Sequence, residues 1–430
     1  MKTRYQKSNI LLNRALKVMP LGSQTFSKSH IQYPENCAPL YLQRGKGGRV
    51  WDVDGNEYVD LVNGLLPVVL GYQDPEINQA IQAQLEQGIS FSLATELEIE
   101  LAERLIDIIP CAEMVRYGKN GSDVTSAAIR LARAYTKRDR IAVCGYHGWH
   151  DWYIGSTVRN LGIPDAVSQL THRFEYNNIV SLEQLFQTYP GEFAAVIMEP
   201  MSSVEPYPGF LEDVKQLAHK AGAIFILDEI VTGFRYALGG AQALFNVIPD
   251  LATFGKAMAN GMPIAAIVGR ADIMRLMEKI YYSGTFAGET LSIAAAIAVI
   301  DKMKREPVIE SLWETGKKLT QAVTKKIVAF ELADVFHLSG KPPWMFLNTL
   351  DCGAVDRKII RTLFMREMLA YGVLMQSTHN ISYAHTEADI DWVSNAYEHV
   401  LSVIQDELAN AEGLKERLGC AIIEPVFKIR

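Results

Sequence analysis

Two short apolar stretches, 223–228 (AIFILD) and 251–256 (LATFGK), decide how this sequence is expected to fold. Each has the length and composition of a buried strand, and each stops at a charged side chain, Asp228 in the first and Lys256 in the second. Ligands of open α/β sheets bind outside the carboxyl ends of the strands. The sequence therefore predicts that a carboxylate and an amine meet at that edge of a sheet.

An acid and an amine in this position suit the cofactor pyridoxal 5'-phosphate (PLP). Its ring nitrogen needs a carboxylate to stay protonated, and its aldehyde needs a lysine to form a Schiff base. Taken alone, Lys256 resembles a surface lysine at a helix start, and Asp228 resembles a helix cap or turn residue. The strand-end positions and the adjacent glycine favour the interpretation that both are catalytic and bind the cofactor.

The rest of the chain alternates between helix and strand patterns. Between residues 75 and 300 we expect further strands at 114–117, 141–144, 194–198 and 264–268, separated by helices. Such apolar strands indicate an α/β fold with a mostly parallel sheet buried on both faces. We expect an N-terminal helix and β-meander (1–60) that packs with the small domain, a large PLP-binding domain (61–300) and a smaller α+β C-terminal domain (301–430).

Composition narrows the class of protein. The chain has 430 residues, of which 49% are hydrophobic, so it can build a large core. Its net charge of −7 and lack of a long basic run give nucleic-acid binding no electrostatic support. Five scattered cysteines without CxxC spacing indicate a reduced, cytoplasmic protein with no structural metal. No apolar run approaches the ~18 residues that span a membrane, and the N-terminus does not resemble a signal peptide.

Three further stretches are candidates for the cofactor site, each with an ordinary alternative. In 119–123 (KNGSD), Gly121 and Ser122 begin a helix and could bind a phosphate, or the stretch could simply cap the helix. In 146–152 (YHGWHDW), an aromatic ring could stack on a flat cofactor, or the tryptophans could fill a hydrophobic corner. The two histidines there lack a third metal ligand. The stretch 283–286 (SGTF) could contact a phosphate or be a common loop.

Several motifs in order resemble one family: VWDVDGNEYVD (50–60), VLGYQDPEI (69–77), NGSD (120–123), GYHGWHD (145–151), LDEIVTGFR (227–235), FGKAMANGMP (254–263) and SGTF (283–286). From about residue 8 to 405 the chain resembles class III PLP-dependent aminotransferases of the aspartate-aminotransferase fold. Within that group it is most similar to glutamate-1-semialdehyde 2,1-aminomutase.

The resemblance assigns roles to individual residues. It implies that Lys256 is the Schiff-base lysine, that Asp228 pairs with the ring nitrogen, and that Tyr146 and Ile230 cover the two ring faces. It also implies that Gly121 and Ser122 hold the phosphate, and His147 is counted with the cofactor-binding residues. Thr285 matches a threonine that reaches the neighbouring subunit's phosphate, which implies a homodimer with composite sites. Substrate contacts are expected from three residues: Lys28, Trp149 and Glu199.

The chain also departs from the aminomutase pattern. Lys28 stands where an arginine binds the substrate carboxylate, and lysine cannot form the bidentate fork. The loop 153–167 is shorter than the gating loop, and 376–385 has neither the acidic residue of the aminomutase nor the arginine of ornithine- and GABA-type relatives. Val231 replaces a glutamine that contacts the ring hydroxyl in many relatives, and Arg235 is an alternative carboxylate clamp.

These departures favour amino transfer between two molecules. The expected donor is glutamate, and the expected acceptor is a ketone or aldehyde, such as a sugar or specialised-metabolite intermediate. The alternatives are an aminomutase and a PLP-dependent epimerase or decarboxylase of the same fold.

Overall fold

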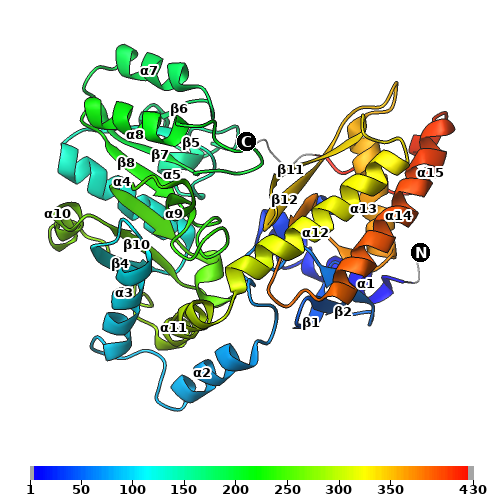
Figure 1. Cartoon of the computed structure of the whole chain (residues 1–430), viewed down its shortest axis with the longest axis horizontal. Coiled ribbons are helices and arrows are strands. Elements are labelled where there is room, and N and C mark those ends of the chain that lie inside the picture. The colour runs from blue at the N-terminus through cyan, green and yellow to red at the C-terminus, as the bar shows by residue number, and fades with distance from the viewer. Residues whose placement is uncertain (1–3, 425–430) are drawn as a thin grey trace. The chain divides into compact units, whose positions relative to one another are not determined.

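The structure is a computed structural model that describes residues 4–424 (Figure 1). The described residues form two compact units: unit 1 comprises 4–74 and 310–424, and unit 2 comprises 75–309. Unit 2 is therefore one continuous stretch of chain, whereas unit 1 combines two stretches from opposite ends of the sequence. No helix among the described residues is long and apolar enough to cross a membrane.

A seven-stranded sheet forms the centre of unit 2. Its order is β4-β10-β9-β8-β7-β5-β6. β10 is antiparallel to both of its neighbours, and the other adjacent strands are parallel, which confirms the prediction of a mostly parallel sheet. The strands are β4 (Met114–Gly118), β5 (Arg140–Cys144), β6 (Thr171–Arg173), β7 (Phe193–Met198), β8 (Ile224–Asp228), β9 (Leu251–Phe254) and β10 (Ala265–Gly269).

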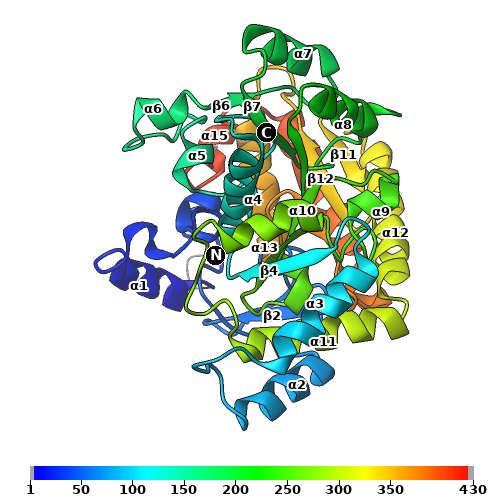
Figure 2. The same ribbon diagram turned by 90° about the vertical axis from the view of Figure 1, so that its left-hand side faces the viewer.

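Helices cover both faces of this sheet because the central strands are apolar on both sides. Successive side chains of a strand point to opposite faces: Ile226 packs with the cluster that includes Val124 and Leu131 of α4, and Phe225 with the cluster that includes Val214 of α8. α10 packs on α4 (Figure 2). The helices are α2 (Pro75–Leu85), α3 (Glu96–Ile108), α4 (Gly121–Thr136), α5 (Asp151–Ile154), α6 (Asp165–Ser168), α7 (Ile179–Thr188), α8 (Phe210–Lys220), α9 (Ala241–Phe245), α10 (Ala271–Met274) and α11 (Thr290–Arg305).

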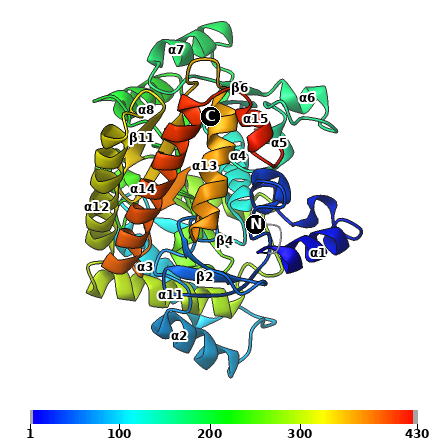
Figure 3. The same ribbon diagram turned by 90° about the vertical axis from the view of Figure 1, so that its right-hand side faces the viewer.

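Unit 1 contains two small sheets, ordered β1-β2-β3-β13 and β11-β12-β14. The predicted meander forms β1 to β3, and β13 from the far end of the chain adds to it, parallel to β3. α13 and α14 lie side by side (Figure 3). The strands are β1 (Leu42–Lys46), β2 (Arg49–Asp52), β3 (Glu57–Asp60), β11 (Phe336–Lys341), β12 (Trp344–Thr349), β13 (Val373–Leu374) and β14 (Thr378–Asn380).

The division between the units falls within α12 (Val308–Ala329), most of which lies in unit 1 with the remaining α-helices of that unit. They are α1 (Gln6–Ala15), α13 (Arg357–Ala370), α14 (Glu387–Ala409) and α15 (Leu414–Arg417). The start of α1 is held by the hairpin turn between β2 and β3, where Asp54 accepts hydrogen bonds from the amides of Lys7 (2.7 Å) and Ser8 (2.9 Å). A carboxylate from another element thus caps the helix.

Candidate active site

The candidate site of unit 2 is built at the carboxyl ends of parallel strands. Five of these strands are each followed or ended by a residue that the sequence analysis singled out: Gly121 after β4, His147 after β5, Glu199 after β7, Asp228 at the end of β8 and Lys256 after β9. β8 and β9 are neighbours, with Asp228 opposite Thr253. The fold therefore gathers side chains that are far apart in sequence at one edge of the sheet.

Asp228 is a buried carboxylate, 4% exposed, with hydrogen bonds to both oxygens. Its Oδ1 accepts from the Ile230 amide and from the Thr253 hydroxyl, both at 3.1 Å, and its Oδ2 lies 2.7 Å from His147 Nδ1. A buried charge needs such partners, because an unpaired one is strongly destabilising. The three contacts fix the orientation of the carboxylate, as a hydrogen-bond acceptor for a ring nitrogen requires.

His147 contacts two acceptors. Its Nδ1 lies beside Asp228, and its Nε2 lies 3.2 Å from the carbonyl oxygen of Cys144. Trp152 stacks on the ring, with 6.4 Å between centroids. His150 turns to a different partner, the Ser126 hydroxyl at 2.7 Å. Within residues 4–424 no group of three potential ligands for a metal ion occurs.

Lys256 follows β9 and begins a short 3₁₀ turn, Lys256–Ala259. Its φ angle is +42°, in the left-handed region that costs a non-glycine residue of order 1–3 kcal/mol. Such strain persists only where the surroundings enforce the conformation. Ile230 lies beside this turn: a Cβ on Gly255 would be 3.1 Å from Ile230, and a Cβ on Gly121 would be 3.3 Å from it. Ile230 thus packs between the strand end that carries the lysine and the start of α4.

The start of α4 has the features of an anion site. Asn120 and Asp123 form a capping box, and Gly121 and Ser122 are the first two helical residues, whose amides have no acceptor within an α-helix. These amides and the helix dipole favour a phosphate. The loop after β5 closes on this helix start: the Ser122 hydroxyl accepts from the Trp149 amide at 3.2 Å, and a Cβ on Gly148 would lie 2.3 Å from that hydroxyl.

Glu199 supports the same loop from β7. It is 6% exposed, and its Oε2 accepts a hydrogen bond from the Tyr146 amide at 3.0 Å. A Cβ on Gly145 would lie 2.5 Å from this carboxylate, so glycine is needed for the close approach. Tyr146 in turn packs edge-on against Tyr153, with 5.6 Å between ring centroids. Glu199 and Tyr153 therefore fix the position of the Tyr146 ring.

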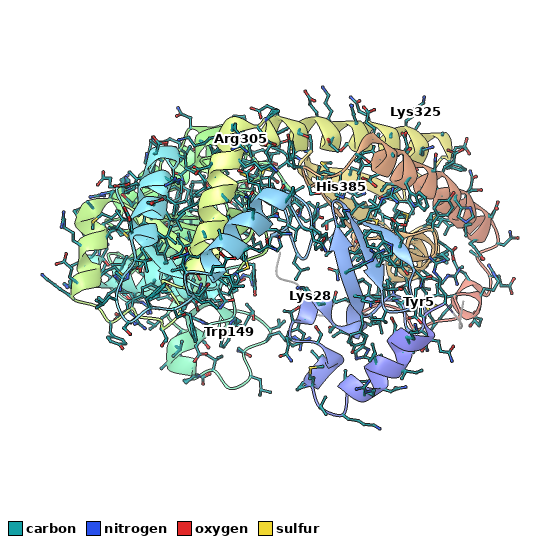
Figure 4. The ribbon with its side chains drawn as sticks, turned by 90° about the horizontal axis from the view of Figure 1, so that it is seen from below. Tyr5, Lys28, Trp149, Arg305, Lys325 and His385 are labelled. Atoms are coloured by element: carbon teal, nitrogen blue, oxygen red, sulfur yellow. The ribbon has the colours of Figure 1, made fainter. Side chains whose placement is uncertain are left out.

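The remaining candidates are less enclosed. Trp149 is 68% exposed at the surface of unit 2 (Figure 4), and Thr285 is exposed before α11. Lys28 is exposed in unit 1, in the 3₁₀ turn Phe26–Lys28, where its charge acts on Asp60. Burial raises the pKa of Asp60, and Lys28 is one of several partners that oppose this rise.

Arg235 does not suit the role of an alternative carboxylate clamp. Its side chain is fully buried, and burial lowers its pKa to about 10. A substrate cannot reach a guanidinium in this position without displacing the surrounding core. The sequence LDEIVTGFR alone does not show that Arg235 is buried.

Two polar residues that shape the site escaped the sequence analysis. Thr253, within β9, contacts Asp228 directly. Glu229 is fully buried and accepts hydrogen bonds from the amides of Ala241 (2.7 Å) and Gln242 (2.8 Å), which ties the chain after β8 to the start of α9. Burial raises the pKa of Glu229. A threonine inside an apolar strand was the available signal for the first, and a second acid beside Asp228 for the second.

Comparison with known proteins agrees with this geometry. The family model for class-III aminotransferases matches residues 31–335. The chain is 36% identical to 3-aminobutyryl-CoA aminotransferase of Cloacimonas acidaminovorans, over 95% of this chain and 99% of that protein. It is 34% identical to glutamate-1-semialdehyde 2,1-aminomutase 2 of Lachnoclostridium phytofermentans, over 94% and 97% of the two chains. Among solved structures, the FumI protein of Sphingopyxis sp. MTA144, in its PLP internal aldimine form, superposes with a TM-score of 0.88 at 28% identity, over 95% and 98% of the two chains.

The fold and the site thus define a PLP-dependent transaminase. The chain belongs to the class-III aminotransferases, as its motifs predicted. The residues at the sheet edge fit the cofactor: a helix start for the phosphate, a buried oriented carboxylate for the ring nitrogen, and a lysine on the adjacent strand end.

Proposed function

We propose that this transaminase moves an amino group between two small molecules, from a donor such as glutamate to a ketone or aldehyde acceptor. The observation that carries the proposal is the pair of residues on adjacent strand ends, the buried Asp228 and Lys256. PLP, when bound, supplies an electron sink for the charge that develops on the substrate carbon. Lys256 would take a proton from that carbon and return it to a neighbouring atom, as a general base and acid.

The other residues in this proposal bind and orient. Asp228 would accept the hydrogen bond of the protonated ring nitrogen, with His147 and Thr253 fixing its direction. Tyr146 and Ile230 would cover the ring faces, and Gly121 and Ser122 would donate amides to the phosphate. Glu199 would contact the substrate side or support Tyr146, and Lys28 and Trp149 remain proposed substrate contacts.

The central test is chemical labelling of the lysine. Borohydride reduction of the enzyme loaded with PLP, followed by peptide mapping, should place the pyridoxyl group on Lys256. Lys256→Ala should bind PLP only noncovalently and lose turnover by at least about 10²–10⁴-fold. A label on another lysine would overturn the assignment.

Transamination and isomerisation can be distinguished by whether an amino donor is consumed. The curated relatives include an aminotransferase and aminomutases at similar identity. Lys28 in place of arginine and the short loop 153–167 favour transamination, because they leave fewer groups to retain an intermediate until it is re-aminated. The donor should then be consumed in proportion to product. Efficient conversion of glutamate-1-semialdehyde to 5-aminolevulinate without any donor would establish the aminomutase alternative.

We further propose a cytoplasmic homodimer in which Thr285 completes the partner's phosphate site. The support is the exposure of Thr285 and of apolar side chains in the same unit, including Phe91, Leu93 and Phe286. Light scattering should give a dimer. Mixing a Lys256→Ala protein with a Thr285→Ala protein should restore activity through hybrid sites, and a fully active monomer would contradict the proposal.

A further inference from the structure

The segment that carries Thr285, residues 281–289, is attached to the β4 strand and to α4, at whose start the candidate phosphate site lies. Arg130 Nη1 donates to the carbonyl oxygen of Tyr281 at 2.6 Å, and Arg116 Nη2 donates to that of Tyr282 at 3.3 Å. The side chain of Tyr282 also reaches the end of β4, since a Cβ on Gly118 would lie 2.5 Å from its hydroxyl. One end of the segment is therefore fixed to the protein beside the phosphate site.

The other end is fixed by an ion pair. Lys119, immediately before the Asn120 cap of α4, places its Nζ 2.9 Å from Oε2 of Glu289. Glu289 is also the N-cap of α11, where it accepts from the Leu291 amide at 2.7 Å and the Ser292 hydroxyl at 2.6 Å. Burial alone would raise the pKa of Glu289, but the hydrogen bonds from Ser292 and Lys119 outweigh it and hold the pKa below its usual value.

The burial of this pair sets it apart from other ion pairs at α11. The side chains of Lys119 and Glu289 are 19% and 12% exposed, whereas those of Lys304 and Asp107 are 47% and 62% exposed. Exposed pairs contribute little, because water and salt screen them. A less exposed pair, charged and hydrogen-bonded, holds its geometry more firmly.

We propose that Lys119 and Glu289 are positioning residues that hold the start of α4 and the Thr285 segment in a fixed relation, and so strengthen PLP binding. The inference rests on the proposed roles of Gly121, Ser122 and Thr285. Because the pair lies between a helix start that binds phosphate and a segment that serves the partner's phosphate, it also links the two cofactor sites of the dimer.

The test is the affinity of the apoenzyme for PLP, measured by titration and fluorescence. Lys119→Met and Glu289→Gln should each weaken PLP binding about tenfold, which corresponds to about 1.4 kcal/mol. Glutamine keeps an oxygen for capping α11, so the variant removes mainly the charge. The double variant should bind no more weakly than either single one, because both single changes break the same contact. Lys119→Arg should restore most of the affinity.

The direction in which Glu289→Gln changes PLP affinity distinguishes the positioning role from direct binding of the phosphate by Lys119. If Lys119 acted directly on the phosphate, removing Glu289's charge would free it and leave PLP binding unchanged or tighter, and that result would overturn the inference. Asp107→Asn, which breaks the exposed pair between α3 and Lys304 of α11, should change PLP affinity less than twofold. The free energy of unfolding of the apoenzymes, measured by thermal unfolding, should fall far less than the free energy of PLP binding. An equal loss in both free energies would show a merely structural role.

Failure of this inference is distinguishable from failure of the proposed function. If borohydride labels the wild-type enzyme on Lys256 but the variants have unchanged PLP affinity, only the positioning role is contradicted. If the wild-type enzyme is labelled on another residue, the proposed site itself is contradicted.

Discussion

Unit 1 and unit 2 are built from this chain in different ways. Unit 2 is continuous, and its mostly parallel sheet places five candidate site residues at or after strand ends: Gly121, His147, Glu199, Asp228 and Lys256. Unit 1 joins the two ends of the chain: β13 pairs Val373 with Val59 of β3, and Asp54 caps a helix some 50 residues earlier. The comparison teaches that strand ends with candidate site residues can be recognised from local sequence, whereas pairings between distant segments cannot.

The largest expected effect is on the reaction rate, and it distinguishes two buried aspartates at opposite ends of neighbouring strands in unit 2. Asp228 ends β8, and Asp250 precedes β9, where it accepts from the Phe225 amide at 2.9 Å. Asp228→Asn should slow the half-reaction with an amino donor at least about a hundredfold, since breaking a buried charge contact typically costs ~3–5 kcal/mol and ~1.4 kcal/mol is tenfold in rate.

The matched control is Asp250→Asn. It should lower stability and leave the half-reaction, followed by stopped-flow absorbance, within about twofold. Equal slowing by both variants would mean that the carboxyl-end position of Asp228 has no special role, and the distinction between the two ends of the sheet would fail.

A smaller effect is expected in unit 1, from pH. His379 is fully buried in β14, with Nε2 at 2.7 Å from the Tyr397 hydroxyl, and burial lowers its pKa to about 4. As pH falls, His379 is therefore protonated in the unfolded chain before it is protonated in the folded protein. The stability that neutral His379 contributes is fully present above about pH 6.5 and is lost as pH falls towards 4. Between pH 7 and 5 the free energy of unfolding should fall by about 2 kcal/mol.

Hydrogen exchange of β14 amides measures this loss within unit 1. His379→Gln should flatten the pH dependence whatever its effect at neutral pH. A wild-type exchange free energy that does not change between pH 7 and 5 would show that protonation of His379 is not coupled to opening of unit 1.

The smallest effect concerns the long-range cap of α1. Asp54→Ala removes two hydrogen bonds to the first turn and should destabilise the helix by about 1 kcal/mol. Asp54→Asn keeps an acceptor oxygen and should lose less. Exchange of α1 amides is the measurement, and equal protection in all three proteins would show that the helix start needs no cap from the hairpin.

The sequence predicted the mostly parallel sheet and most of its strands, because short apolar runs between helices are a local signal. It missed β6 (Thr171–Arg173) in that sheet, and β11 (Phe336–Lys341) and β14 (Thr378–Asn380) in unit 1. β6 and β14 have three residues each and no apolar pattern. It singled out Lys256 and Asp228 because each follows an apolar strand. The contact between His147 and Asp228, 81 positions apart, depends on strand order, which periodicity does not encode.

The backbone at Lys256 was also beyond prediction. A φ angle of +42° usually signals glycine or asparagine, and nothing in FGKAMANGMP marks the lysine as the residue that adopts it. Thr253 was read only as part of a strand, because one hydroxyl in an apolar run is ambiguous until its neighbour is known. Pairing with β8 makes that hydroxyl a partner of Asp228.

The pairing of β13 with β3 has a consequence for folding during synthesis on the ribosome. The N-terminal part of unit 1 is synthesised first, yet its sheet lacks β13 until residue 374 emerges. At about 5–20 residues per second, unit 2 takes on the order of ten to fifty seconds to be made in between. During that interval β3 has an open edge, whereas unit 2 is complete before β13 is made, so the last strand pairing of the N-terminal sheet forms after unit 2 has been synthesised.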